Sequence, residues 1–166
     1  MSTADAPLPV APEVPGPAPH LLLVRAPYYR DVVDGMTRGA LRVLDGARAT
    51  HDVLDVAGAF ELAQAIRLAL RGTRALSGDR RYDGYVALGC VVRGQTDHYD
   101  HICRESMSGL MSVALQYGIA LGTGLLTVHS VAQAEARSGD DGHNKGAEAA
   151  AAALLQVAAA RRLGAA

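Results

Sequence analysis

The chain has 166 residues, enough for one globular domain with a sizeable hydrophobic core. Its content of 49% hydrophobic and 20% charged residues is ordinary for such a domain, and its net charge of −1 provides no excess cationic field. Because nucleic acids and anionic membrane surfaces are bound through such a field, we expect neither as a partner.

The cysteine spacing and the lengths of the apolar runs indicate the cellular compartment of the protein. Cys90 and Cys103 show no disulfide-framework spacing, and His98, His101 and Cys103 do not converge on one helix face, so we expect reduced thiols and no metal site. No apolar run approaches the length of a membrane span, and the N-terminus lacks the basic-then-apolar pattern of a secretion signal. These features predict a cytoplasmic protein.

Residues 1–19 hold six of the seven prolines of the chain. Proline fixes φ and removes a backbone donor, so a segment this rich in proline is not expected to supply a sheet strand. The sequence predicts an extended or disordered leader over 1–19, followed by a single domain over 20–166.

From residue 20 onward, apolar runs typical of buried strands alternate with amphipathic stretches of helical spacing. In chain order, the expected elements are a strand at 21–25, a helix at 29–47, a strand at 51–56, a helix at 61–70, a strand at 85–92, a helix at 102–117, a strand at 121–127, a short helix at 131–137 and a long alanine-rich helix at 146–163. Four successive strand–helix units predict an α/β fold, a three-layer α/β/α sandwich with a four-stranded parallel sheet of flavodoxin-like architecture.

The loops with chemically useful residues all follow the carboxyl end of a predicted strand. These loops are 26–29, 57–61, 94–100 and 127–130. In open parallel sheets ligands bind outside the carboxyl ends of the strands. The sequence therefore predicts a binding site at this edge of the sheet.

The segment GCVVRGQTDHYD at 89–100 is the most informative of these. Its apolar strand stops at Arg93, and a polar loop then brings His98 next to a predicted helix start. Helix N-termini bind anions, and an imidazole transfers protons near neutral pH. Two interpretations remain open: a catalytic histidine beside an anion site, or a solvated histidine with Asp97 and Asp100 capping the helix.

Two further segments have both a functional and a plain structural interpretation. GAFE at 58–61 offers a glycine turn, a phenyl face and a carboxylate, or it is only a turn whose Glu61 favours a helix start. Arg137 and Lys145 form an anion clamp, or they flank a plain loop with Asn144 as helix cap.

In this order, these segments resemble the lumazine synthase family from about residue 20 to the last helix. The most specific matches are GAFE at 58–61, LGCVVRGQTDHYD at 88–100, GLM and YGI within 109–119, LT at 126–127 and NKGAEAA at 144–150. The stretch PYYRDVVDGMTRGA at 27–40 is also similar to the family's first loop and helix.

The resemblance implies a condensation in riboflavin biosynthesis. The family joins 5-amino-6-ribitylamino-uracil to 3,4-dihydroxy-2-butanone 4-phosphate, which gives 6,7-dimethyl-8-ribityllumazine, phosphate and water. No metal or redox cofactor takes part. Schiff-base formation, phosphate elimination and ring closure require positioning, a proton shuttle and a phosphate cradle.

The resemblance also implies roles for individual residues, in a site shared between subunits of a pentamer. His98 is the implied proton-transfer residue, and Gln95 and Thr96 bind the phosphate. Arg137 reaches that phosphate from a neighbouring subunit. Lys145 is placed with the substrate-binding residues on the separate ground of its charge at a helix N-terminus. The other implied substrate-binding residues are Tyr28, Ala59, Phe60, Glu61, Cys90, Val91, Val92 and Thr123.

Some positions depart from the family pattern. Tyr28 stands where the family usually has phenylalanine, Thr123 where some members carry an aromatic ring, and Asp141 near a position often held by lysine. A non-catalytic flavin or lumazine binder, or a shell protein of the same fold, is the alternative. A flavin mononucleotide module is disfavoured because loop 26–29 lacks serine and threonine. Family assemblies are pentamers, paired pentamers or sixty-subunit shells, with riboflavin synthase as a candidate partner; the leader favours a single pentamer.

Overall fold

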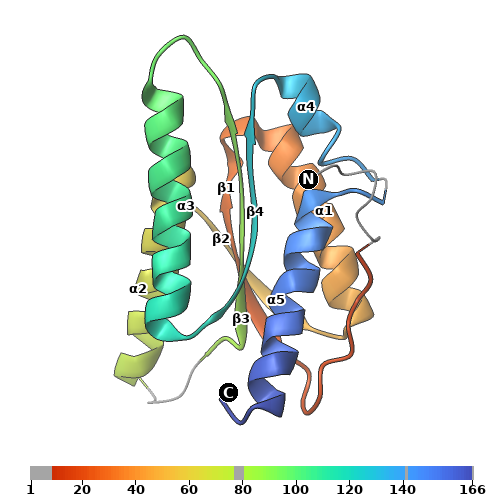
Figure 1. Ribbon diagram of the computed structural model, residues 1–166. Coiled ribbons are helices and arrows are strands. Elements are labelled where there is room, and N and C mark those ends of the chain that lie inside the picture. Colours follow the sequence, from red (N-terminus) through yellow and green to blue (C-terminus); the bar gives the residue numbers. More distant parts are fainter. Residues whose placement is uncertain (1–8, 77–80, 141, 166) are drawn as a thin grey trace.

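The computed structural model describes residues 9–76, 81–140 and 142–165, and its central element is a parallel sheet, seen in the middle of Figure 1. The strands are β1 (His20–Ala26), β2 (Thr50–Asp55), β3 (Gly84–Val92) and β4 (Ala120–Val128), in the order β2-β1-β3-β4. Every neighbouring pair is parallel, which confirms the predicted four-stranded parallel sheet.

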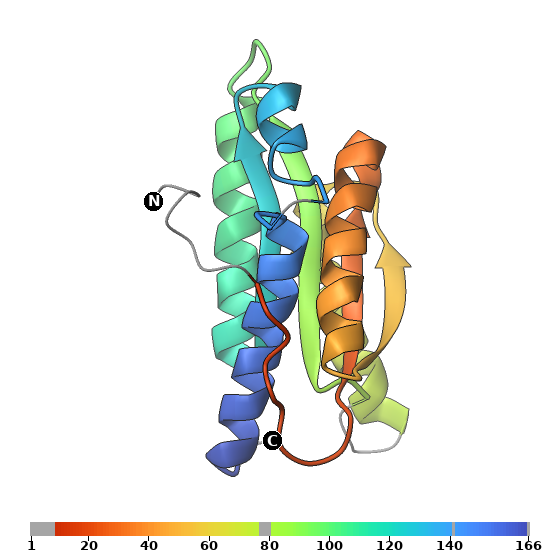
Figure 2. The same ribbon diagram turned by 90° about the vertical axis from the view of Figure 1, so that its right-hand side faces the viewer.

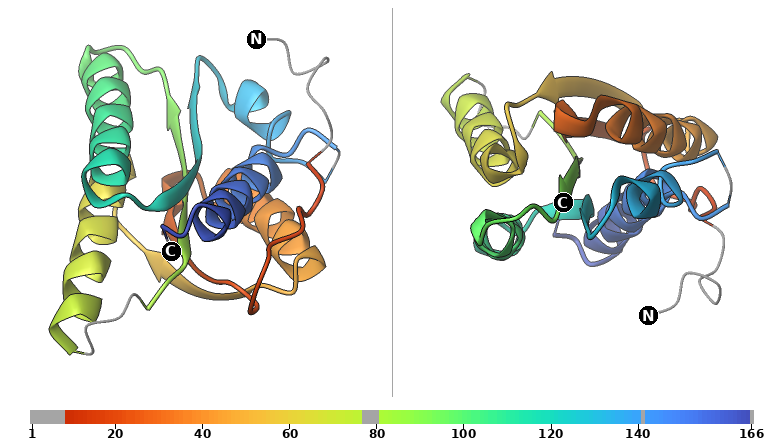
Figure 3. Two further views of the ribbon diagram at one scale, coloured as in Figure 1. Left: turned by 60° about the horizontal axis from the view of Figure 1, so that its bottom comes forward. Right: turned by 90° about the horizontal axis from the view of Figure 1, so that it is seen from above.

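Helices cover both faces of this sheet. On one face lie α1 (Arg30–Gly46) and α5 (Lys145–Arg162), and on the other lie α2 (Leu62–Leu76) and α3 (His98–Tyr117), as Figures 1 and 3 show. The short elements are the 3-10 turns η2 (Pro27–Tyr29) and η3 (Ala59–Glu61) and the helix α4 (Val131–Glu135). The three-layer α/β/α architecture is therefore confirmed.

Two hydrophobic clusters hold the layers together, one on each face of the sheet. The first joins the sheet to α1 and α5 through residues such as Leu23, Met36 and Leu154. The second joins it to α2 and α3 through residues such as Val24 and Ile66. The central strand β3 is buried from Gly84 to Cys90, as expected for a parallel strand covered on both faces, whereas the edge strand β2 is largely exposed.

The described part of the leader, residues 9–19, is extended and lies against the α1–α5 face (Figure 2). Ala11 and Val14 pack on the first hydrophobic cluster. The guanidinium of Arg161 donates to the main-chain oxygens of Pro15 and Pro17 at 2.8 and 2.6 Å. These contacts tie the end of the leader to the last turns of α5.

One boundary differs from the sequence expectation in a way that matters for the site. The third long helix was expected from residue 102, but α3 begins at His98. The main-chain oxygen of Asp97 accepts from the N–H groups of Asp100 and His101 at 3.0 and 3.3 Å, which starts the helix one turn earlier. Hydrophobic periodicity cannot detect this turn, because residues 98–101 carry no aliphatic side chain.

The topology opens a crevice between two of the strands. After β1 the chain turns to α1 on one face, and after β3 it turns to α3 on the other face. β1 and β3 are neighbours in the sheet, so this is the point where the strand order reverses and where such sheets bind ligands. Among the described residues, no helix combines the length and apolarity needed to cross a membrane.

Candidate active site

A pocket of about 550 Å³ opens at this reversal point, outside the carboxyl ends of the strands. Its walls come from the segments after β1 and β2, from the end of β3 and from the first turns of α3. The lining residues are Tyr28, Tyr29, Ala57, Gly58, Ala59, Phe60, Glu61, Cys90, Val91, Val92, Gly94, Thr96, His98, Tyr99 and Ile102. The volume is within the range of small-molecule sites.

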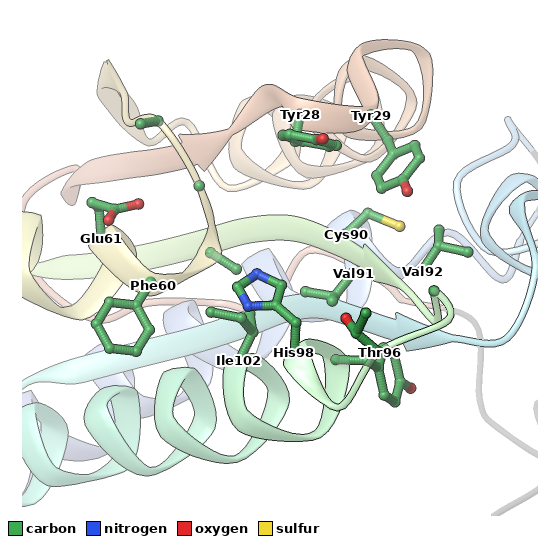
Figure 4. A pocket seen from close by; sticks show the side chains of 15 residues that line it. Tyr28, Tyr29, Phe60, Glu61, Cys90, Val91, Val92, Thr96, His98 and Ile102 are labelled. Atoms are coloured by element: carbon green, nitrogen blue, oxygen red, sulfur yellow. The ribbon is translucent and has the colours of Figure 1, made fainter.

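His98 is the first residue of α3, and its ring extends into this pocket (Figure 4). Its position at a helix N-terminus places it beside main-chain N–H groups that have no partner within the helix. Asp97 precedes it as the cap residue, although its carboxylate makes no capping hydrogen bond. The imidazole is thus exposed in a pocket next to a positive helix end, which suits proton transfer near an anion.

The GAFE segment forms the wall next to His98. Gly58 is extended, and the 3-10 turn η3 that follows turns the ring of Phe60 and the carboxylate of Glu61 toward the pocket. Phe60 remains 47% exposed. An exposed phenyl ring beside a carboxylate is suited to an aromatic ligand with hydroxyl groups.

Two tyrosines form another wall after β1. The rings of Tyr28 and Tyr29 meet edge to face, with centroids 5.3 Å apart. Tyr29 is half-buried on the first hydrophobic cluster, whereas Tyr28 is 77% exposed. Tyr28 thus presents a free ring face to the pocket, braced from behind by Tyr29.

The floor of the pocket is the end of β3, at Cys90, Val91 and Val92. Burial raises the pKa of the Cys90 thiol to about 11. Burial also raises the pKa of Cys103 on α3, and this effect outweighs the interaction with Tyr99, which lowers that pKa. Both thiols are therefore protonated at neutral pH and are poor nucleophiles.

This protonation predicts slow alkylation of the native protein. At pH 8, native protein should react with iodoacetamide far more slowly than protein unfolded in urea, because only the thiolate is nucleophilic. Mass spectrometry of the modified peptides would measure both sites. Equal rates in native and unfolded protein would contradict the burial of Cys90.

Four of the residues expected at the site do not line this pocket. Gln95 is exposed on the loop before α3, and Thr123 is exposed on the edge strand β4. Arg137 lies after α4, where its Nη1 donates to the main-chain oxygen of Gln133 at 2.8 Å. Lys145 begins α5, and its Nζ donates to both carboxylate oxygens of Glu148 at 2.6 and 2.7 Å.

Asn144 organises the loop between Arg137 and Lys145. It is fully buried and caps α5, because its Oδ1 accepts from the N–H groups of the helix's second and third residues at 2.9 and 3.1 Å. Its Nδ2 donates to three main-chain oxygens, those of Gly35, Ser138 and Gly139. The predicted cap is confirmed, and the same side chain also fastens the loop to α1. Asp141 lies outside the described residues.

The sequence interpretation did not single out several lining residues as ligands. Tyr29, Tyr99 and Ile102 are the ones with large side chains. Ile102 is four residues after His98, so both lie on one face of α3. An earlier predicted helix start would have revealed this pair. Among the described residues, no group of three or more His, Cys, Asp or Glu side chains is arranged to hold a metal ion.

Comparison with known proteins supports the resemblance seen in these motifs. The family model described as 6,7-dimethyl-8-ribityllumazine synthase matches residues 18–161. This chain belongs to that family. It is similar to the 6,7-dimethyl-8-ribityllumazine synthase of Paramagnetospirillum magneticum, with 43% identity over 87% of this chain and 96% of the relative. It is also 46% identical to 6,7-dimethyl-8-ribityllumazine synthase 1 of Rhizobium meliloti, over 88% of this chain and 94% of the relative.

The protein of the same name from Agrobacterium fabrum is 43% identical, over 88% of this chain and 97% of the relative. The chain therefore spans nearly the full length of these lumazine synthases. All the motifs that carried the resemblance, from GAFE to NKGAEAA, lie within the residues that the family model matches.

Proposed function

We propose that this chain is an active lumazine synthase of riboflavin biosynthesis, which condenses 5-amino-6-ribitylamino-uracil with 3,4-dihydroxy-2-butanone 4-phosphate. The observation that carries the proposal is the pocket, in which His98, the GAFE turn and the ring of Tyr28 lie together. Relatives that cover almost the same length bear the name of this enzyme. They do not favour the alternative of a non-catalytic binder.

The chemistry divides among the residues of the pocket. The amine of the uracil attacks the ketone carbonyl, and a first water leaves as the imine forms. Phosphate then departs, and the ribitylamino nitrogen adds to the remaining carbonyl carbon, which loses its oxygen as a second water when the ring closes. His98 moves protons in the imine and ring-closing steps, for which its place in the pocket is suited. Tyr28 and Phe60 hold the pyrimidine by ring contacts, and Glu61 accepts hydrogen bonds from ribityl hydroxyls.

The phosphate requires positive charge that the pocket of one chain does not supply. Among the described residues that line the pocket, none is a lysine or an arginine. Thr96 and the helix N-terminus at His98 offer hydrogen-bond donors, and Gln95 is on the same loop. We therefore assign Arg137, with Lys145 and Thr123, to the pocket of a neighbouring copy.

A pentamer or a higher assembly follows from this shared site. It is supported by apolar side chains exposed along α3, namely Met107 at 46%, Met111 at 60% and Leu115 at 75% exposure. Sedimentation velocity would measure the assembly, and a monomer would contradict the shared site. Riboflavin synthase as a partner and a cytoplasmic location stay predictions.

Formation of the lumazine product tests the enzymatic activity itself. Purified full chain is mixed with both substrates, and product absorbance and fluorescence are followed against the spontaneous reaction. We expect a saturable rate well above that background. A rate equal to the background would overturn the proposal.

A further inference from the structure

The loop that presents His98 has few contacts of its own. Residues 93–98 are all exposed. Within the part of the chain that the structure describes, the side chains of Gln95, Thr96 and His98 form no hydrogen bond or ion pair. Something other than these side chains must fix the direction of the imidazole.

Arg93, at the start of this loop, connects the strand before the loop to the helix after it. It is the residue directly after β3, and its main-chain N–H donates to the oxygen of Val128 at 2.9 Å, which continues the β3–β4 pairing. Its guanidinium donates to Oδ1 of Asp100, in the first turn of α3. It also lies over the ring of Tyr99, 4.6 Å from the centroid. One side chain thus joins the end of the strand to the start of the helix.

Tyr99 gives the guanidinium a fixed surface. The Tyr99 side chain is half-buried, and its hydroxyl lies near the side chains of Thr127 on β4 and Cys103 on the next turn of α3, both of which influence its pKa. Burial is the main reason that the pKa of Tyr99 is raised. The first turn of α3 is therefore held to the sheet by Tyr99 and to the end of β3 by Arg93.

These contacts flank the catalytic candidate. Tyr99 directly follows His98 and Asp100 is two residues further, so fixing both of them fixes the backbone that carries the imidazole. An exposed ion pair alone is weak, and so is an exposed cation–π contact. Here both act on a single guanidinium, and its planar shape suits pairing and stacking together.

We propose that Arg93 is a positioning residue, which orients His98 through Asp100 and Tyr99. The inference rests on the proposed function and adds a residue that does not itself line the pocket. It differs from a direct role in substrate binding, because Arg93 acts on the rate through His98 and not on the affinity for the phosphorylated substrate.

The test compares Arg93→Ala and Arg93→Lys in the lumazine-formation assay. We expect Arg93→Ala to lower kcat about tenfold with KM for both substrates nearly unchanged, since small displacements of a catalytic group cost rate. Arg93→Lys keeps the positive charge that pairs with Asp100 but loses the planar group that stacks on the Tyr99 ring. Its kcat should therefore lie between those of the wild type and Arg93→Ala. The melting temperature is measured for each variant to show that the fold is retained.

The chain offers a matched control at the opposite edge of the sheet. Arg81 pairs with Asp52 at 2.8 Å and lies over the Tyr82 ring, 5.2 Å from its centroid. Arg81→Ala removes the same kinds of contact far from the pocket, so kcat should stay at the wild-type value. If both arginine variants lowered kcat equally, the effect would be general and the proposal would fail.

A double variant, in which Arg93→Ala is combined with His98→Ala, decides whether Arg93 acts through His98. In a His98→Ala protein there is no imidazole to orient, so adding Arg93→Ala should cause no further loss of kcat. A further tenfold loss in that background would overturn the proposal. So would a higher KM for the butanone phosphate at unchanged kcat, which would make Arg93 a substrate contact. The rate of the wild-type protein above the spontaneous reaction tests the proposed function, and the rates of the variants relative to wild type test the role of Arg93.

Discussion

An Asn144→Ala variant should lose about 3–5 kcal/mol of unfolding free energy, because a buried side chain with five hydrogen bonds leaves its partners unsatisfied. Two of those partners are N–H groups at the start of α5, and three are main-chain oxygens of α1 and the preceding loop. The site is also tightly packed: a Cβ atom on Gly39 would lie 2.1 Å from Asn144 Oδ1. Truncation to alanine therefore leaves a gap in a closely fitted site, lined by polar groups without partners.

Urea denaturation of the variant would measure this loss. Gln156→Ala on the same helix is a suitable control, because Gln156 is an exposed residue whose amide makes a single, part-buried hydrogen bond, to the oxygen of Leu121 at 2.9 Å. The control should lose no more than about 1 kcal/mol. If Asn144→Ala does not fold, Asn144→Ser keeps a capping oxygen and loses the amide donors without placing a charge against the three main-chain oxygens, so its loss should be intermediate. Equal losses in Asn144→Ala and the control would contradict the role of Asn144.

An Arg137→Ala variant should raise KM for 3,4-dihydroxy-2-butanone 4-phosphate about 100-fold, because a charge-assisted contact to phosphate is lost. KM for the uracil substrate should change little, since the proposed contacts of that substrate are Tyr28 and the GAFE turn. Steady-state kinetics with each substrate varied in turn would measure both constants. Arg162→Ala, an exposed arginine at the far end of α5, is the control. An unchanged KM for the phosphorylated substrate would show that Arg137 does not bind phosphate.

The layered fold could be predicted because its strands and helices carry strong hydrophobic periodicity. β3 shows this well, since its apolar run matches the buried strand almost residue for residue. The first turn of α3 could not be found in this way, because it is held by main-chain hydrogen bonds to Asp97 and by polar side chains. Asp100 illustrates the point: one interpretation of the sequence has it cap the helix, but its carboxylate pairs with Arg93.

The site could be predicted only in part for a related reason. Residues that follow successive parallel strands meet at one edge of the sheet. The topology alone therefore predicts that the site contains residues 28, 59–61, 90–92 and 98. Arg137 and Thr123 could be placed in the site only by resemblance to the family. In one chain they lie outside the pocket, and only the assembly decides whether they complete another.

Subunit mixing is the most direct test of the central claim, that one copy supplies the pocket with His98 and another supplies Arg137. His98→Ala and Arg137→Ala chains are produced together with different tags, and the mixed assemblies are purified through both tags. In a random mixture about one quarter of the sites combine an intact His98 with an intact Arg137. At a butanone phosphate concentration far below the KM of the Arg137→Ala parent, the rate of lumazine formation should therefore recover to about one quarter of wild type. If the mixed assemblies are no faster than the mean of the two parent variants, both residues serve the same chain's site and the shared site is wrong.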